Sequence, residues 1–376
     1  MSHIIIIGGG MAAISAAQAA RTANADATIT IFAKEPYLPY QRPMLSKGLA
    51  TGVDLDKIRI KPANWYADQQ IALCTNAAIT TIDPIAHTVT GEDGSTTHWD
   101  ALILATGALA FLPPLDVDAF TLRTYDDLQA IRAALDTAAC LTVVGGGVLG
   151  LEMAWEARSR LPVTVLEAGP HLLSRQLSAT AARRVAAYLA QNSVDVRTNV
   201  QSEQIKELSA GVVCVAAGVR ADIRLAQAAG LTTGRGIIVD ACMATSVAGI
   251  FAAGDVAELT GGYTGLLSVA NGQGAIAGAN AVAFIQGLDM KPYTITPPPA
   301  MLKIGDMSLL SVGDFVQGEA LIYQDAARYV ELHVVQRALV GGILMGDVSK
   351  GGKLSVAVSR KTAVQASDAL AVLDQL

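Results

Sequence analysis

The chain has 376 residues, of which 52% are hydrophobic and only 5% aromatic. At roughly 100–200 residues per domain this length predicts two or three domains, and the apolar content excludes a disordered chain. The net charge of −6 argues against a nucleic-acid-binding protein. No apolar run reaches the roughly 18 residues of a membrane-spanning helix, and residues 4–7 are too short a run for a signal peptide. We therefore expect a cytoplasmic protein that does not insert into membranes.

The four cysteines are widely separated and form no C-x-x-C pair. They are Cys74, Cys140, Cys214 and Cys242. A disulfide framework is not expected in a cytoplasmic chain of this size, and the spacing does not indicate a metal site. We expect these cysteines to be small core residues.

An internal duplication organises much of the chain. Residues 3–36 and 140–170 each read as strand, glycine turn, Ala-rich helix and strand. Each is a βαβ unit of about 30 residues, the size of a nucleotide-binding half. Because the alternation of strands and helices continues, we predict an α/β fold with two Rossmann-like, doubly wound parallel sheets.

Later segments complete this plan. Strands ending in glycine turns are predicted at 101–107, 212–218 and 249–255, followed by a helix from about residue 268 to 286. Residues 296–299, Thr-Pro-Pro-Pro, predict a stiff linker. Beyond it, alternating segments such as 329–335 and a closing helix over about 362–373 predict a small α+β domain. The predicted domains are 1–110 with 237–300, then 111–236, then 301–376.

The first glycine turn fits G-x-G-x-x-A between a strand and a helix. Gly8 permits the tight turn, Gly10 lets the backbone approach a pyrophosphate, and Ala13 lets helix and strand pack closely. The helix N-terminus offers N–H groups to phosphates. The predicted contacts are Gly8, Gly10, Met11, Ala12 and Ala13; the alternative is a glycine-rich turn of any α/β protein.

The second turn is the fuller G-x-G-x-x-G. Its predicted cofactor contacts are Gly145, Gly147, Val148, Leu149 and Gly150, with Gly218 at the later turn of the same copy. Glu167 follows Gly145 by 22 residues, the offset of an acid that binds the adenosine ribose. A carboxylate there would repel a 2′-phosphate and favour NADH. Arg175 leaves use of NADPH open, and a solvent-exposed charge is the alternative reading of Glu167.

Two dinucleotide motifs in one chain resemble the pyridine nucleotide–disulfide oxidoreductase family, whose fold is glutathione-reductase-like. In that family the first motif binds FAD and the second binds NAD(P)H. The turns at Thr106-Gly107 and at Asp255 sit where the family has them. The resemblance implies that Thr106 and Gly107 line the FAD site, that Asp255 holds the ribityl–pyrophosphate region, and that the helix after Asp255 points its N-terminus at the flavin.

A narrower resemblance comes from residues 37–47, which are similar to the PY-x-RPxLSK segment of rubredoxin reductases, oxygenase ferredoxin reductases and apoptosis-inducing factor. It implies that Arg42 reaches the FAD phosphate or adenosine. It also implies that Lys47 reaches the flavin and pairs with Glu152; an exposed surface charge is the alternative for each. Residues 302–314 resemble a segment of NADH:rubredoxin reductases and of the flavoprotein half of nitrite reductases.

The chain departs from the family pattern at two points. Ala33 stands where the first unit should carry its ribose acid, so we expect either Glu35 to reach the FAD ribose or Lys34 to contact the pyrophosphate or adenine. Ile79 either packs on the adenine or belongs to the core. No redox-active cysteine pair or single active cysteine stands where relatives carry one.

These residues predict an NADH-dependent FAD oxidoreductase, of the rubredoxin or ferredoxin reductase type, that transfers electrons to a small carrier protein such as rubredoxin. We expect a monomer or homodimer. One alternative is an NADH oxidase or another NADH:acceptor reductase that uses oxygen, nitrite-reductase-type chemistry or a small molecule. Another is a slow-turnover sensor that binds FAD and NADH. The basic residues of segment 57–61 could dock an acidic carrier or could be an ordinary solvated face.

Overall fold

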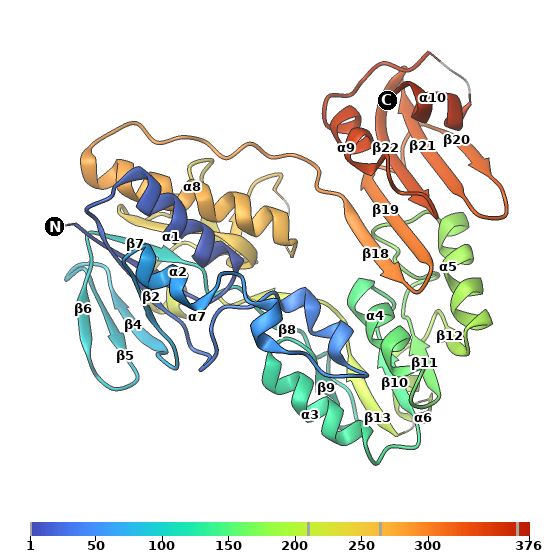
Figure 1. Ribbon diagram of the computed structural model, residues 1–376, viewed down its shortest axis with the longest axis horizontal. Coiled ribbons are helices and arrows are strands. Elements are labelled where there is room, and N and C mark those ends of the chain that lie inside the picture. Colours follow the sequence, from blue (N-terminus) through green and yellow to red (C-terminus); the bar gives the residue numbers. More distant parts are fainter. Residues whose placement is uncertain (1, 209–210, 263–264, 366–367) are drawn as a thin grey trace. The chain divides into compact units, whose positions relative to one another are not determined.

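The computed structural model describes residues 2–208, 211–262, 265–365 and 368–376 (Figure 1). The chain forms two compact units. The first comprises residues 1–41, 54–109 and 219–295, and the second comprises residues 42–53, 110–218 and 296–376. The two units do not follow the predicted domain boundaries, since the predicted C-terminal domain 301–376 is part of the second unit. Residues 42–53 belong to the second unit rather than the first, and residues 219–236 belong to the first rather than the second.

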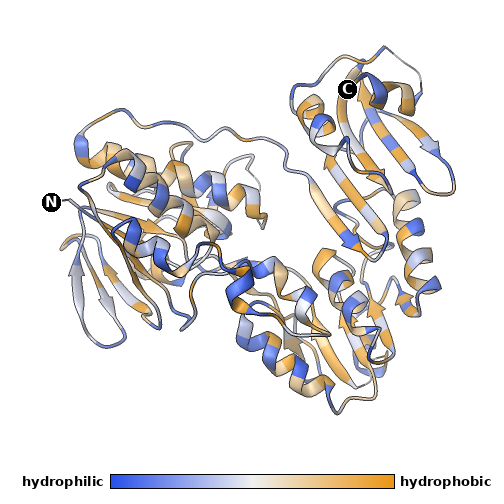
Figure 2. Ribbon diagram, viewed as in Figure 1, coloured by the Kyte–Doolittle hydropathy of each residue, from blue (hydrophilic) through white to orange (hydrophobic). Residues whose placement is uncertain are grey.

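The core of the first unit is a five-stranded parallel sheet in the order β16-β7-β1-β2-β3. Its central strand, β1, carries four consecutive isoleucines, Ile4–Ile7, that are almost fully buried, as expected where helices cover both faces of a parallel sheet. Figure 2 shows the same hydrophobic character along the sheet strands. The strands are β1 (His3–Ile7), β2 (Thr28–Phe32), β3 (Ile71–Cys74), β7 (Ala101–Leu104) and β16 (Ile250–Ala252).

Two long helices of this unit, α1 and α8, pack closely against each other. Added Cβ atoms at Gly274 and Gly278 of α8 would collide with backbone carbonyls of Ala12 and Ala16 in α1, so only glycine allows this approach. The helices of the unit are α1 (Met11–Ala23), α2 (Ala63–Asp68), α7 (Arg224–Ala228) and α8 (Leu267–Gln286), with the short helices η3 (Leu55–Ile58) and η5 (Gly254–Val256).

Three small sheets surround this core. The antiparallel sheet β4-β5-β6 consists of β4 (Ile79–Asp83), β5 (Thr88–Gly91) and β6 (Thr96–His98). The other two are pairs: β8 (Ala108–Ala110) with β14 (Val219–Ala221), and β15 (Ile237–Val239) with β17 (Ala257–Leu259).

The second unit contains a sheet of the same design, in the order β12-β11-β10-β13-β9 and parallel throughout. Its strands are β9 (Phe120–Thr121), β10 (Leu141–Val144), β11 (Val163–Leu166), β12 (Val194–Arg197) and β13 (Val212–Val215). Its helices are α3 (Tyr125–Leu135), α4 (Val148–Ala157), α5 (Ala179–Gln191) and α6 (Ile205–Leu208), with η1 (Arg42–Met44), η2 (Ser46–Gly48) and η4 (Ser202–Gln204). The duplication read from the sequence is therefore present as two parallel sheets, and the predicted α/β class is confirmed.

The C-terminal part of the second unit is an antiparallel sheet in the order β18-β19-β22-β21-β20 with two helices. The elements are β18 (Ala300–Ile304), β19 (Met307–Gly313), β20 (Glu319–Gln324), β21 (Tyr329–Val335), β22 (Ala338–Met345), α9 (Gly351–Ser359) and α10 (Ala369–Gln375). The predicted small α+β domain is confirmed. The predicted closing helix over 362–373 is present as α10, which begins only at Ala369; residues 362–365 are not helical, and residues 366–367 lie outside the described residues.

Side chains alternate between the two faces of this C-terminal sheet. Val330 and Leu332 of β21 face a cluster that includes residues of α9 and α10. Tyr329, Glu331 and His333 point to the opposite face and are also buried. On that side α4 packs against β18 and the start of α5 contacts β21, so both faces of the sheet are covered within the second unit. Among the described residues, no helix combines the length and apolar character needed to cross a membrane.

Candidate functional site

The first glycine turn links β1 to α1. The Gly8 amide donates to the Phe32 carbonyl at 2.8 Å, and a Cβ on Gly8 would strike the Ala105 carbonyl oxygen, so the turn requires glycine there. At Gly10 the opposite holds: no heavy atom lies within 4 Å of the place where a Cβ would stand. Gly10 is also the N-cap of α1 and supplies no side-chain cap. The first amides of α1 are thus left for an external acceptor, which fits the pyrophosphate of a dinucleotide.

The second glycine turn repeats this geometry. The Gly145 amide donates to the Leu166 carbonyl at 2.8 Å, and a Cβ on Gly145 would lie 2.5 Å from the Ala216 carbonyl oxygen. Gly147, the N-cap of α4, again has an open side and no side-chain cap. The residues present therefore fit two dinucleotides, one in each unit.

The two units differ at the end of their second strand. Glu167 accepts hydrogen bonds from the Gly146 and Gly169 amides, both at 2.6 Å, which fix its carboxylate beside the glycine turn. In the first unit Ala33 takes the same place: a Cβ on Gly9 would lie 3.0 Å from the Ala33 Cβ, as one on Gly146 would lie 3.2 Å from the Glu167 Cβ. The expectation that Ala33 replaces a ribose acid agrees with this equivalence.

The remaining predicted residues of the second motif lie around its turn. Val148 and Leu149 are half-buried in the first turn of α4, and Gly150 is buried. A Cβ on Gly150 would strike the Gly145 carbonyl oxygen, which explains the third glycine of the motif. Gly218 adopts a positive φ of 98° and has open space on its Cβ side. All four lie with Glu167 at the carboxyl end of one sheet, where ligands of doubly wound folds bind.

The residues predicted for the first motif also gather at one sheet end. Met11, Ala12 and Ala13 form the first turn of α1, and Ala13 is fully buried. Thr106 donates through its hydroxyl to the Asp222 carbonyl at 3.0 Å, and Gly107 accepts from the Asp222 amide at 3.0 Å.

Asp255 lies in the short helix η5, and its carboxylate accepts from the Gly265 amide at 3.2 Å. A residue missed by the sequence reading supports this turn: Gln273 of α8, which is 1% exposed, accepts from the Gly254 amide at 2.9 Å. The feature of the sequence that could have indicated this role is a glutamine among the small residues of the predicted helix.

Four further predicted residues lie outside the two glycine turns. Lys34 is exposed, and Glu35 accepts from the Tyr40 hydroxyl at 2.6 Å. Ile79 begins β4 and packs, half-buried, against the core of the first unit. Arg42 donates to the Arg123 carbonyl at 2.8 Å within the second unit.

The second unit brings together the residues of the narrower motif. Ser46 in η2 is buried and donates to the Glu152 carboxylate of α4 at 2.6 Å; the neighbouring Lys47 is exposed. Burial raises the pKa of Glu152, while the Ser46 hydrogen bond and the Lys47 charge act in the opposite direction. Lys47 and Glu152 thus interact within one unit, whereas the sequence placed Lys47 in the first nucleotide domain.

Glu156, one helical turn beyond Glu152, is a second carboxylate near Lys47 that the sequence reading missed. Burial raises its pKa, with the Arg158 and Lys47 charges opposing. The four-residue spacing of two acids in α4 was the available signal.

The basic segment 57–61 is less cationic than its sequence suggests. Lys57 lies 3.8 Å from Asp54, and Arg59 forms an ion pair with Asp56. Lys61 lies over the Trp65 ring, 5.0 Å from its centroid. Because two of the three cations have acidic neighbours, this segment offers little net positive charge.

Fold and site together define a protein with two dinucleotide-binding units and a C-terminal α+β domain. Residues 2–274 match the family described as pyridine nucleotide-disulphide oxidoreductase. The chain belongs to this family. Residues 298–362 match a second description, the rubredoxin NAD+ reductase C-terminal domain.

Individual relatives agree with this assignment. The chain is 32% identical to an NADH-rubredoxin oxidoreductase of Clostridium acetobutylicum, over 100% of this chain and 99% of the relative. It is 35% identical to the ferredoxin–NAD(+) reductase subunit of the benzene 1,2-dioxygenase system of Pseudomonas putida, over 72% of each chain. The crystal structure of NADH:rubredoxin oxidoreductase from Clostridium acetobutylicum superimposes with a TM-score of 0.87 and 31% identity, covering 100% of both chains.

Proposed function

We propose that this protein is an NADH-dependent FAD oxidoreductase that passes electrons to a small carrier protein of the rubredoxin type. The observation that carries the proposal is the pair of equivalent glycine turns, of which only the second is followed by a ribose acid, Glu167. The full-length similarity to an NADH-rubredoxin oxidoreductase and the match of residues 298–362 to a rubredoxin reductase domain support the choice of acceptor.

The roles of the residues follow from their chemistry. Gly8, Gly10 and the N-terminus of α1 bind the FAD pyrophosphate, and Asp255 binds the ribityl–pyrophosphate region. When bound, FAD accepts a hydride and returns single electrons. We propose that the first unit is the FAD-binding domain.

In the second unit, Gly145, Gly147 and the N-terminus of α4 bind the pyrophosphate of NADH. Glu167 accepts hydrogen bonds from the adenosine ribose and disfavours a 2′-phosphate. We propose that Lys47, paired with Glu152, aligns the nicotinamide ring and adjusts the charge of the flavin. The isolated, free cysteines support a reducing, cytoplasmic location and electron transfer without a redox disulfide. The proposed oligomeric state is a monomer or a homodimer.

The test is an anaerobic titration of the FAD-loaded protein with NADH, followed by a comparison of acceptors. The purified protein should be yellow, be bleached by NADH, and reduce rubredoxin faster than oxygen or nitrite. Protein that stays colourless after reconstitution with FAD would contradict the whole proposal. Rapid turnover with oxygen and none with rubredoxin would instead support an oxidase, and binding without turnover would support a sensor.

A further inference from the structure

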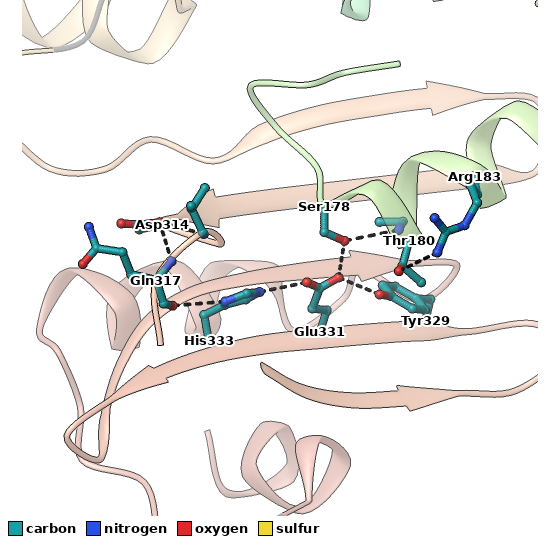
Figure 3. Close-up of polar contacts among 10 residues, drawn as sticks. Ser178, Thr180, Arg183, Asp314, Gln317, Tyr329, Glu331 and His333 are labelled. Carbon is teal, nitrogen blue, oxygen red and sulfur yellow. Dashed lines mark hydrogen bonds and ion pairs between the residues drawn. The ribbon is translucent and has the colours of Figure 1, made fainter. Parts of the chain in front are cut away.

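This inference rests on the proposed function, because it concerns the pyridine-nucleotide site of the second unit. It starts from a buried carboxylate in the C-terminal domain. Glu331 of β21 is 3% exposed and accepts three side-chain hydrogen bonds (Figure 3). They come from the Ser178 hydroxyl at 2.6 Å, the Tyr329 hydroxyl at 2.6 Å and His333 Nε2 at 2.8 Å. A carboxylate removed from water this completely is stable only with such partners.

The geometry around His333 indicates that its ring is an imidazolium. Nε2 faces the Glu331 carboxylate, and Nδ1 faces the Gln317 carbonyl at 3.2 Å, so both ring nitrogens face acceptors. Burial alone would lower the pKa of His333, but the Glu331 and Gln317 hydrogen bonds and the Glu331 and Asp314 charges raise it on balance.

The pKa of Glu331 is shifted by burial and by its own three hydrogen-bond donors. Burial would raise its pKa, but the hydrogen bonds from His333, Ser178 and Tyr329 lower it on balance. From α5, Arg184 faces the cluster as well, with its guanidinium 5.5 Å from the centroid of the Tyr329 ring. A charged Glu331–His333 pair therefore lies between the C-terminal sheet and α5.

Ser178 connects this pair to the proposed nucleotide-binding part of the second unit. It is the N-cap of α5: its hydroxyl oxygen accepts from the Ala181 amide at 3.3 Å, while its single hydroxyl hydrogen goes to Glu331. The cap therefore cannot rotate freely, because both its donor and its acceptor are used. An N-cap of this kind fixes where a helix begins and how the preceding chain enters it.

The chain that enters α5 is the segment 167–178, which starts at the proposed ribose acid. Its middle is tied to the second glycine turn, because the Leu173 amide donates to the Gly146 carbonyl at 3.0 Å and Leu172 packs against Gly146. At its beginning, the Gly169 amide donates a hydrogen bond to the Glu167 carboxylate. At its end, the Ser178 hydroxyl donates a hydrogen bond to the Glu331 carboxylate. A shift at Ser178 would therefore act on the backbone that positions Glu167.

We propose that Glu331 is a positioning residue for the pyridine-nucleotide site: through Ser178 it holds segment 167–178, and with it Glu167, in the arrangement that binds the NADH ribose. The C-terminal domain then sets nucleotide affinity without contacting the nucleotide. His333 keeps Glu331 charged and oriented, so affinity depends on the charge of a histidine outside the nucleotide site.

The experiment measures binding of NAD+ to the oxidised, FAD-loaded protein by calorimetry, together with KM and kcat for NADH with ferricyanide as acceptor. Ser178→Ala and Glu331→Gln should each raise the Kd about three- to tenfold, with a larger effect on KM than on kcat. Ser178→Thr, which keeps the hydroxyl, should have the same Kd as the wild type. For the wild type, the Kd should rise as pH rises through the pKa of His333, and His333→Gln should remove this dependence.

Ser355→Ala is the matched control, because its hydroxyl donates to the Gly351 carbonyl within α9, on the opposite face of the C-terminal sheet. A purely structural role for the cluster would lower thermal stability in Ser178→Ala and leave the Kd at its wild-type value, which would overturn the inference. If Glu331→Gln fails to fold, the Ser178→Ala and Ser178→Thr pair decides. Wild-type protein that binds no pyridine nucleotide would overturn the proposed function as well, and this outcome is distinct from an unchanged Kd in the variants.

Discussion

The hydroxyl of Ser46 donates to the carboxylate of Glu152 at 2.6 Å, joining two residues that lie 106 positions apart in the sequence. Ser46 immediately precedes Lys47, and Glu152 lies in the helix that follows the second glycine turn. Burial disfavours the charged form of Glu152, whereas the Ser46 hydroxyl and the Lys47 ammonium favour it. The ionisation of this carboxyl is thus sensitive to the loss of any of these neighbours.

The first prediction concerns Ser46→Ala. Removing a hydrogen bond to the carboxylate should raise the pKa of Glu152 further, because only burial and the Lys47 charge then remain. In stopped-flow measurements of flavin reduction by NADH, the acidic limb of the pH–rate profile should move to higher pH. Glu152→Gln should abolish that limb, and Ser355→Ala should leave it in place. An acidic limb that is the same in Ser46→Ala and the wild type would show that Glu152 does not control the reaction.

The second prediction concerns cofactor choice at Glu167. Glu167→Arg removes a carboxylate that is held by two backbone amides and places a cation beside the adenosine ribose. Since a hydrogen bond to a charged group is worth about 1.5–3 kcal/mol, the preference for NADH over NADPH should fall roughly 10- to 100-fold. The measurement is kcat/KM for each nucleotide. Equal preference ratios in the variant and the wild type would place the ribose elsewhere.

The parallel sheets and their glycine turns could be predicted from the sequence because their causes are local. Gly8 and Gly145 stand directly between an apolar run and a helix, and each must avoid a carbonyl of the neighbouring strand. The position of Ala33 could be predicted as well, since it follows from counting along one βαβ unit. Parallel pairing of β1 with β2 and of β10 with β11 then follows from the crossover helix.

Contacts between distant segments could not be predicted in this way. Ser178 and Glu331 are 153 residues apart, and nothing in either neighbourhood specifies the other. The alternation of β21 places Glu331 and His333 on one face of a strand, but polar residues at such positions usually indicate a solvated face. Packing of α5 on that face buries them. Helix α9 was not predicted, because Gly351 and Gly352 disfavour a helix by propensity, yet α9 begins there and packs Leu354 into the core.

The third prediction concerns the pH dependence of stability caused by His333. Its pKa in the folded protein is raised above the ordinary value of 6.5, so its contribution is complete below pH 6.5 and is lost as pH rises through the folded pKa. The pKa of Glu331 is lowered from 4.5, so its contribution is present above pH 4.5 and is lost as pH falls through the folded pKa. The pair should stabilise the fold most between these two ordinary values.

Urea unfolding of the wild type, His333→Gln, Glu331→Gln and the double variant would measure this coupling. The coupling free energy from the double-mutant cycle should be greatest near pH 6 and should decline toward alkaline pH. A coupling that stays constant from acidic to alkaline pH would mean that His333 does not titrate, and that the pair is held by neutral hydrogen bonds alone.

The last prediction is that electron transfer needs no thiol. Cys74, Cys140, Cys214 and Cys242 are all free, and burial raises the pKa of Cys214 to about 12, which leaves its thiol protonated and unreactive at neutral pH. Replacing all four by Ser or Ala should therefore leave turnover largely intact once losses in folding are corrected for. Cys214→Ala is expected to cost the most stability, because its side chain is fully buried.

Anaerobic titration should consume a single equivalent of NADH per flavin, because a redox disulfide would require a second. Lys47→Met serves as the positive comparison. It should slow flavin reduction by NADH, whereas the cysteine variants should not. Consumption of two equivalents, or inactivation of the NADH-reduced protein by a thiol-alkylating reagent, would show that one of these cysteines takes part in the reaction.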